Sequence, residues 1–368
     1  MWTVEKIERD LLLSDICTIV RPIGRIVESV NRVDRVLGTE WITSRSIHKG
    51  LAPTMRVVGM GLRLTAIEGL PRSCELIEKL RQQDSSADSE LTGIYLFRSG
   101  SPGIEVELFP AVGTREADFR MRNGVEDWTT VEVTQATVSK EQMRLQNILK
   151  QLTSAFTSLE GPFSLEVILQ REPSDDEMAR LCNTLPQFCL GGEPKTECLI
   201  DGMGVLLLNQ VPVGQLPYSE IPELANVPSI GLAAIFRVDQ MVTVKIPFSD
   251  NRAEQILTAE SQQLPAGKRG LIMISGPSSV KELDVWEPLV RRRFQPNIHT
   301  RVGGVCLFDG GMVPAGNGSD WQIQAHLIVN SHAKSALPPW ISAAITNANN
   351  TFDQSWASSS RRISGTAR

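Results

Sequence analysis

The chain has 368 residues, of which 41% are hydrophobic and 21% are charged, a balance that is ordinary for a globular protein of two or three domains. No apolar run of about 18 residues occurs and the first six residues carry mixed charge, so we expect a cytoplasmic protein with no transmembrane helix, no membrane association and no secretory signal. The net charge of −5 excludes the general attraction to nucleic acid of a strongly basic protein, so any such binding must depend on a local site.

The first part of the chain, residues 1–84, is predicted to form a helical region. Apolar residues recur at helical spacing within residues 4–38, where Pro22 and Gly24 are expected to divide two helices. Residues 55–70 are apolar and contain three glycines, which favours a strand or a loosely packed loop. A further amphipathic helix is predicted to begin at Ser73 and to end before residue 84.

The next part, residues 85–172, has the clearest succession of elements. Apolar periodicity and turn residues predict a helix, three short strands, a long helix and a fourth strand, at residues 87–98, 104–109, 117–121, 129–134, 140–159 and 163–169. This α-β-β-β-α-β order predicts an α/β core.

The remainder, residues 173–368, is predicted to be an α+β extension that adds strands to the sheet. Its expected helices and strands cover residues 175–184, 254–263, 270–275, 280–293, 304–308 and 323–329. The Ser- and Arg-rich end, from about residue 357, is predicted to be disordered.

Two of the predicted short strands carry an acidic residue between apolar neighbours. Asp118 lies in the strand at 117–121, and Glu132 lies in the strand at 129–134. If the two strands are adjacent, both carboxylates can meet near one end of the sheet, where they would repel each other unless protonated or bridged by a cation. Oxygen ligands of this kind suit Mg²⁺ or Mn²⁺. The alternative is that both acids are surface charges paired with Arg120 or Arg122.

The α-β-β-β-α-β order, with an Asp in the second strand and a Glu in the third, resembles the PD-(D/E)XK nuclease superfamily of restriction enzymes, resolvases and repair nucleases. The resemblance covers less than a quarter of the chain and suggests a bacterial member. It implies a restriction endonuclease-like fold with a mixed central sheet, and a hydrolase that cleaves phosphodiester bonds of nucleic acid with Mg²⁺ or Mn²⁺. DNA is favoured over RNA as the partner, but the sequence leaves the choice between them open. It also implies that Asp118 and Glu132 hold the metal, that Glu90 on the preceding helix joins them, and that Gln142 on the following helix contributes.

The chain departs from the superfamily pattern at two positions. A Lys is expected two residues after Glu132, and Thr134 stands there instead, while Ala117 replaces the Pro that often precedes the Asp. A Thr hydroxyl supplies no positive charge. We therefore expect Lys140 or Gln142, at the start of the next predicted helix, to position the attacking water. The alternative is a catalytically inactive nuclease-like fold that acts as a binding or scaffold module.

Other chemistries find little support in the sequence. The six cysteines form no CxxC pair and the four histidines form no HxxxH or HExxH pattern, which argues against zinc. The segment 270–281 has a strand, a small-residue turn and a helix, but it lacks the Gly-Lys-Ser/Thr end of a phosphate-binding loop. Arg291, Arg292 and Arg293 suit the carboxyl end of a helix, or a contact with a phosphate backbone. The oligomeric state is left open.

Overall fold

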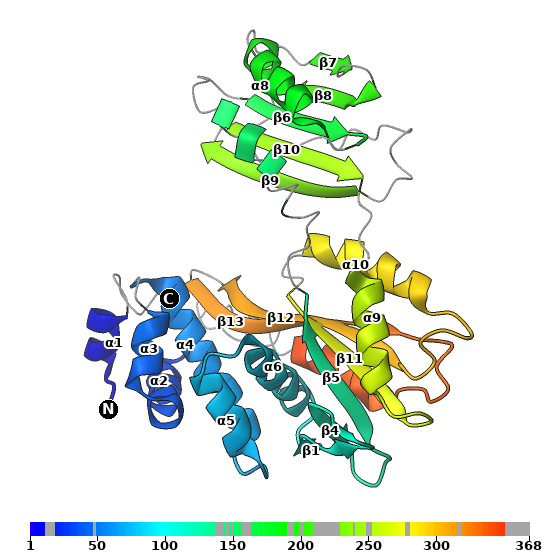
Figure 1. Ribbon diagram of the computed structural model, residues 1–368. Helices are drawn as coiled ribbons and strands as arrows, with labels where there is room; N and C mark the ends of the chain where they lie inside the picture. The colour runs from blue at the N-terminus through cyan, green and yellow to red at the C-terminus, as the bar shows by residue number, and fades with distance from the viewer. Residues whose placement is uncertain are drawn as a thin grey trace, which may run out of the picture. The chain divides into compact units, whose positions relative to one another are not determined.

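The structure is a computed structural model that divides into two compact units: unit 1 comprises Met1–Ala136 and Ala253–Arg368, and unit 2 comprises Thr137–Arg252 (Figure 1). The residues that it describes are 1–11, 19–46, 49–136, 143, 147–148, 150–152, 154–155, 163–171, 173–189, 195–198, 202–209, 229–237, 240–247, 252–276, 280–315 and 318–349. The tail predicted to be disordered, from about residue 357, lies outside these ranges.

Unit 1 begins with helices, as the sequence predicts. They are α1 (Val4–Asp10), α2 (Ile23–Leu37), α3 (Thr39–Arg45), α4 (Leu51–Leu64), the short 3-10 helix η2 (Thr65–Ile67) and α5 (Ser73–Arg81). Pro22 directly precedes α2, because its fixed φ suits the start of a helix and its missing N–H costs nothing there.

The expectation of a strand or loop at residues 55–70 is wrong, because α4 and η2 occupy this segment. The segment is apolar on nearly all sides because α4 is buried on nearly all sides. Its glycines allow close helix packing: a Cβ on Gly61 would collide with the backbone of Ser29 in α2, and a Cβ on Gly59 would meet the Trp321 ring. These glycines therefore serve close contacts and do not loosen the chain.

The centre of unit 1 is a six-stranded mixed sheet in the order β1-β4-β5-β11-β12-β13. β5 is parallel to β11 and β11 to β12, whereas the other neighbours are antiparallel. A small hairpin, β2 and β3, lies between β1 and β4 along the chain. The bounds are β1 (Glu105–Leu108), β2 (Ala111–Val112), β3 (Arg115–Glu116), β4 (Phe119–Arg122), β5 (Thr129–Gln135), β11 (Arg269–Ser275), β12 (Gly304–Ala315) and β13 (Gly318–Val329).

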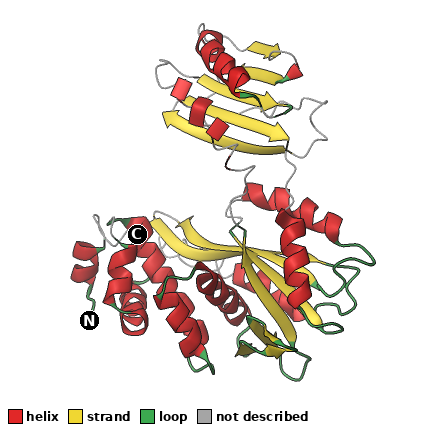
Figure 2. Cartoon of the chain, viewed as in Figure 1, coloured by secondary structure: helices red, strands yellow, loops and turns green. Residues whose placement is uncertain are grey.

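Helices cover both faces of this sheet (Figure 2). The N-terminal helices, α6 (Ser85–Gly100) and the helix of residues 339–349 share one buried cluster with Leu271 and Met273 of β11. On the opposite face, α9 (Arg252–Gln263) and α10 (Val280–Arg293) pack with Ile272 and Ile274 of the same strand. Successive side chains of a strand point to opposite faces, so a strand buried on both sides is apolar throughout. Unit 1 is thus a three-layer α/β/α unit.

Unit 2 has a sheet of its own, in the order β7-β8-β6-β10-β9, and contains the helix α8. The bounds are β6 (Phe163–Leu169), α8 (Asp175–Cys189), β7 (Lys195–Cys198), β8 (Gly204–Asn209), β9 (Ser229–Arg237) and β10 (Gln240–Pro247). β6 is parallel to β10 and antiparallel to β8.

The expected core at residues 85–172 therefore differs from the structure in its last strand. The strand at 163–169 forms as predicted, but it belongs to the sheet of unit 2. Its place beside β5 is taken by β11, which comes from the region predicted to be an extension. Most of the long helix expected at 140–159 lies outside the described residues, and the residues described within it (143, 147–148, 150–152 and 154–155) are helical. Unit 2 is thus inserted between β5 and α9, and local periodicity alone does not reveal which strands pair across such an insertion.

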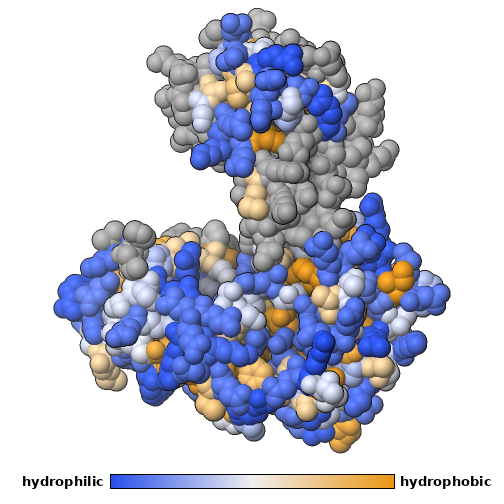
Figure 3. Space-filling model, viewed as in Figure 1, coloured by the Kyte–Doolittle hydropathy of each residue, from blue (hydrophilic) through white to orange (hydrophobic). Residues whose placement is uncertain are grey.

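The surface of unit 1 is largely hydrophilic on the face drawn in Figure 3, with apolar residues scattered over it. None of the helices within the described residues combines the length and the apolar content needed to cross a bilayer.

Candidate active site

Asp118 and Glu132 face each other across two antiparallel strands. Phe119 pairs with Val131, so the residue before β4, Asp118, stands opposite Glu132 in β5. The sequence predicted that Asp118 lies within a strand, but in the structure it lies directly before β4. Its Oδ2 accepts a hydrogen bond of 2.6 Å from the backbone N–H of Val133. The expected meeting of the two carboxylates is therefore present.

The Glu132 carboxyl group is deeply buried in a polar cluster. The residue is 3% exposed, and its Oε1 has no hydrogen-bond partner. Burial raises the pKa of Glu132 to about 8, with further increases from Asp118, Glu260 and Glu90. Burial also raises the pKa of Asp118, and the hydrogen bond between Asp118 and the Glu132 side chain partly offsets this increase. The surface-charge alternative does not hold, because Arg120 and Arg122 pair with Glu107 and Glu105.

Glu90 reaches the same region from α6. It is 3% exposed, its Oε1 accepts a hydrogen bond of 3.2 Å from the Ser86 hydroxyl, and it lies 3.8 Å from the Lys79 ammonium group. Burial, followed by the charge of Asp118, raises the pKa of Glu90 to about 7. The sequence prediction placed Glu90 on the helix before the sheet, and the structure places it there beside the acidic pair.

Glu260 of α9 is a fourth acid, which the sequence analysis missed. Its carboxylate is half-buried and is hydrogen-bonded by the Thr134 side chain and, at 2.6 Å, by Gln263 Nε2. Burial and the charge of Asp118 raise its pKa, and the hydrogen bond from Thr134 lowers it. The helix at 254–263 was predicted, but only the pairing of β5 with β11 makes it the helix that precedes the fourth strand of the core sheet.

The two helix residues expected to position water, Lys140 and Gln142, lie outside the described residues. Thr134 is beside the cluster but faces Glu260, so its hydroxyl holds a carboxylate. Among the described residues, the cation that lies beside the acids is Lys79 of α5, whose charge lowers the pKa of both Glu90 and Asp118. Nothing in the sequence pattern singles Lys79 out, because it is one of several charged residues on an amphipathic helix.

Phe109 links these acids to a pocket. Its backbone N–H donates to the Asp118 carbonyl at 3.0 Å, and its ring contacts Lys79 and Arg72 at 4.4 and 5.1 Å from its centroid. Phe109 and Arg72 both have positive φ, of 51° and 61°, and Arg72 donates a 2.6 Å hydrogen bond to the Phe109 carbonyl. Strained backbone of this kind persists where its surroundings enforce it, often beside functional sites.

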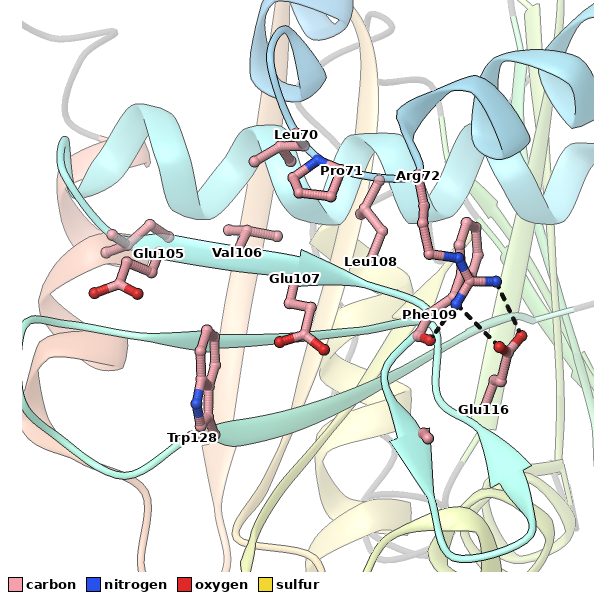
Figure 4. A pocket seen from close by; sticks show the side chains of 12 residues that line it. Leu70, Pro71, Arg72, Glu105, Val106, Glu107, Leu108, Phe109, Glu116 and Trp128 are labelled. Carbon is pink, nitrogen blue, oxygen red and sulfur yellow. Dashed lines mark hydrogen bonds and ion pairs between the residues drawn. The ribbon is translucent and has the colours of Figure 1, made fainter.

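The pocket itself runs along the edge strand β1 and has a volume of about 630 Å³ (Figure 4). Arg72 and Glu116 pair at 2.9 Å near Phe109, and Trp128 stands beside Glu107 farther along the strand. The acids of the site do not line the pocket. The residues that line it are Leu70, Pro71, Arg72, Ile104, Glu105, Val106, Glu107, Leu108, Phe109, Ala111, Glu116 and Trp128.

The cluster thus contains four carboxyl groups. Glu90, Glu132 and Glu260 come from α6, β5 and α9, and Asp118 comes from the position directly before β4. The oxygen donors of the cluster are the ligand type that Mg²⁺ and Mn²⁺ prefer, and the unpartnered Glu132 Oε1 leaves one donor free. Within the described ranges, no three acidic, histidine or cysteine side chains are already arranged around a single metal position. Binding would therefore require side chains of the cluster to turn toward a common point.

No known family, curated protein or solved structure matches this chain.

Proposed function

We propose that the protein is a divalent-cation-dependent nuclease of the PD-(D/E)XK type that hydrolyses phosphodiester bonds, with DNA as the first substrate to test. The observation that carries the proposal is the burial of Glu132 against Asp118, with one carboxylate oxygen unpaired and two further acids close by. Buried carboxyl groups cost free energy and are seldom gathered without a role.

The order of elements in unit 1 supports the proposal. α6, β1, β4, β5, α9 and β11 repeat the helix, three strands, helix and strand of that superfamily, with unit 2 inserted before α9. Asp118 precedes the second of these strands and Glu132 lies in the third. Glu90 and Glu260 lie on the two helices, one before and one after the three strands.

The donor set fits Mg²⁺ or Mn²⁺, with Asp118, Glu132 and Glu90 as the residues that would hold the ion. A bound ion of this kind supplies an activated water and offsets negative charge at phosphorus. In the hydrolysis, water adds to phosphorus, one ester P–O bond breaks, and the leaving oxygen takes up a proton.

Among the described residues, Glu260 is the one that we assign to the water-positioning role expected of Lys140 or Gln142. Thr134 and Gln263 fix its carboxylate, and its raised pKa brings it nearer to neutral pH. A carboxylate so tuned can accept the proton of an attacking water. In this proposal Thr134 therefore acts by orienting Glu260.

A cleavage assay tests the proposal. Supercoiled plasmid, single-stranded DNA and RNA are incubated with wild type and with Asp118→Asn, Glu132→Gln and Glu126→Gln, in Mg²⁺, in Mn²⁺ and in EDTA. Glu126 is the control because it is an acid of the same unit that pairs with Arg269 at 3.0 Å, away from the cluster. We expect cation-dependent cleavage that Asp118→Asn and Glu132→Gln each lower about 100-fold or more, and that the control retains. Equal cleavage by all variants would refute the site.

The second candidate is a catalytically inactive binding or scaffold module of the same fold. It is favoured by the strand position of Thr134, where a Lys would be expected and where the side chain instead bonds Glu260. Binding of nucleic acid without cleavage of any form, in either metal, would support this alternative.

A further inference from the structure

The candidate site has an excess of negative charge that a phosphodiester substrate must overcome. Burial is the largest cause of the raised pKa values of Glu132, Glu90 and Glu260, and the four carboxyl groups also influence one another. The charges of Asp118, Glu260 and Glu90 raise the pKa of Glu132 further, and the charge of Asp118 raises the pKa values of Glu90 and Glu260. A phosphate group approaching this cluster would be repelled, and one divalent cation offsets only part of the charge.

Lys79 supplies the opposite charge. Among the described residues, it is the only basic side chain whose charge lowers the pKa of Asp118 and of Glu90. Its ammonium group lies 3.8 Å from Glu90 Oε1 and 4.4 Å from the centroid of the Phe109 ring, and the side chain is 43% exposed. The group is therefore held at the edge of the cluster and remains accessible to a ligand.

The position of Lys79 relates the acids to the pocket. Phe109 lines the pocket, carries the Lys79 ammonium over its ring and hydrogen-bonds the Asp118 carbonyl. A chain of nucleotides lying along the pocket would thus meet Lys79 where it reaches the acids. An ammonium group with three donors suits a phosphate oxygen, whereas the Thr134 hydroxyl carries no charge.

We propose that Lys79 is the phosphate-binding cation of this site and contacts the phosphodiester that is cleaved. The inference rests on the proposed function, because it identifies the residue that lets an anionic substrate approach the acids. Lys79 comes from a helix outside the α-β-β-β-α-β core, so the positive charge is supplied by the N-terminal helical region.

The experiment compares wild type with Lys79→Met, Lys79→Arg and Lys268→Met. Lys268 is an exposed lysine in the turn before β11, at the end of that strand remote from the carboxyl ends of β5 and β11. Two quantities are measured for each protein: Mn²⁺ affinity by calorimetry, and kcat/KM for cleavage of a DNA oligonucleotide with Mn²⁺. Circular dichroism and thermal unfolding check that each variant folds.

The two readouts are expected to change in opposite directions. Removing the positive charge beside Glu90 should tighten Mn²⁺ binding by about three- to tenfold, because a repulsion disappears. The same change should lower kcat/KM by about 10- to 100-fold, because the phosphate loses its cationic contact. In Lys79→Arg, the Mn²⁺ affinity and kcat/KM should both lie close to the wild-type values, and Lys268→Met should match wild type in both.

Other outcomes overturn either the inference or the proposed function. Unchanged Mn²⁺ affinity in Lys79→Met would remove Lys79 from the site, and a parallel loss of metal binding and cleavage would mean that it only supports the fold. Tighter Mn²⁺ binding with unchanged kcat/KM would refute the phosphate contact. A wild-type protein that binds Mn²⁺ but cleaves nothing would refute the nuclease, and with it the contact to a cleaved phosphodiester. No Mn²⁺ binding by wild type would refute both.

Discussion

The Glu132 side chain hydrogen-bonds the carboxylate of Asp118, the residue that stands opposite it across β4 and β5. Two carboxylates can share such a bond only if one of them keeps its proton, and burial, followed by the charge of Asp118, raises the pKa of Glu132 to about 8. The resting site without metal is therefore less negative than its four acids suggest.

This proton predicts an unusual dependence of stability on pH. The folded pKa values of Glu132 and Glu90, about 8 and about 7, lie above the usual 4.5. Their contribution to stability is complete below pH 4.5 and is lost as the pH rises through 7 to 8. We expect the metal-free protein to unfold at lower temperature at pH 8.5 than at pH 6. Glu132→Gln should reduce the loss in the free energy of unfolding between these pH values by a few kcal/mol, because each unit of raised pKa corresponds to about 1.4 kcal/mol. Thermal unfolding in EDTA measures it, and equal pH slopes for the two proteins would contradict it.

Metal binding should release protons from the same groups. Glu132 and Glu90 must ionise before they coordinate a cation, so Mn²⁺ affinity should rise between pH 6 and pH 8.5. Calorimetry in two buffers of different ionisation enthalpy counts the protons released. Asp118→Asn should weaken binding roughly 10- to 100-fold, and Glu126→Gln should leave it unchanged. Affinity that does not vary with pH would argue that these carboxyl groups do not hold the ion.

Glu260 can be separated from the metal-holding acids by its kinetics. If it accepts a proton from water, Glu260→Gln should lower kcat about 100-fold while Mn²⁺ affinity changes less than threefold or so. Thr134→Val should have a smaller effect of the same kind, because the carboxylate stays but loses the hydroxyl that orients it. A Glu260→Gln variant that loses metal binding as strongly as Asp118→Asn would instead make Glu260 a ligand.

The helical part of unit 1 offers a test of packing that is independent of the site. Gly61→Ala would force a methyl group against the backbone of Ser29 and should destabilise the protein by about 3 kcal/mol. Gly24→Ala is the matched control, because a Cβ there has open space within the first turns of α2, and it should stabilise by up to about 1 kcal/mol. Denaturant unfolding gives both values, and equal changes would show that the α2–α4 contact is not close.

Much of the local structure of unit 1 could be predicted from the sequence because each element carries its own pattern. β5 and α6 appear near their predicted positions, and Asp118 and Glu132 are opposed as expected. α4 was missed because a helix buried on nearly all sides has few polar residues to mark its period, and its glycines mimic a loop.

The long-range arrangement was harder to predict because it depends on pairing between distant segments. β6 follows β5 along the chain and has the right composition for a fourth core strand, yet β11 pairs with β5. Glu260 was missed for the same reason, since its role depends on the helix that this pairing brings to the sheet. Lys79 was missed because its significance lies in its distance from Glu90 and not in its spacing along α5.

The insertion between β5 and α9 also affects how the protein is made. During synthesis β1, β4 and β5 emerge after the N-terminal helices, and the edge of β5 that pairs with β11 has no partner until all of unit 2 and then β11 have left the ribosome. An unpaired strand edge is prone to pair with other chains, and contacts so distant in sequence form slowly. The cluster of four acids cannot assemble before α9 has emerged, because Glu260 belongs to that helix. A nascent chain of this protein is therefore expected to depend on the rapid folding of unit 2, and a nuclease built in this way would stay inactive until its synthesis is nearly complete.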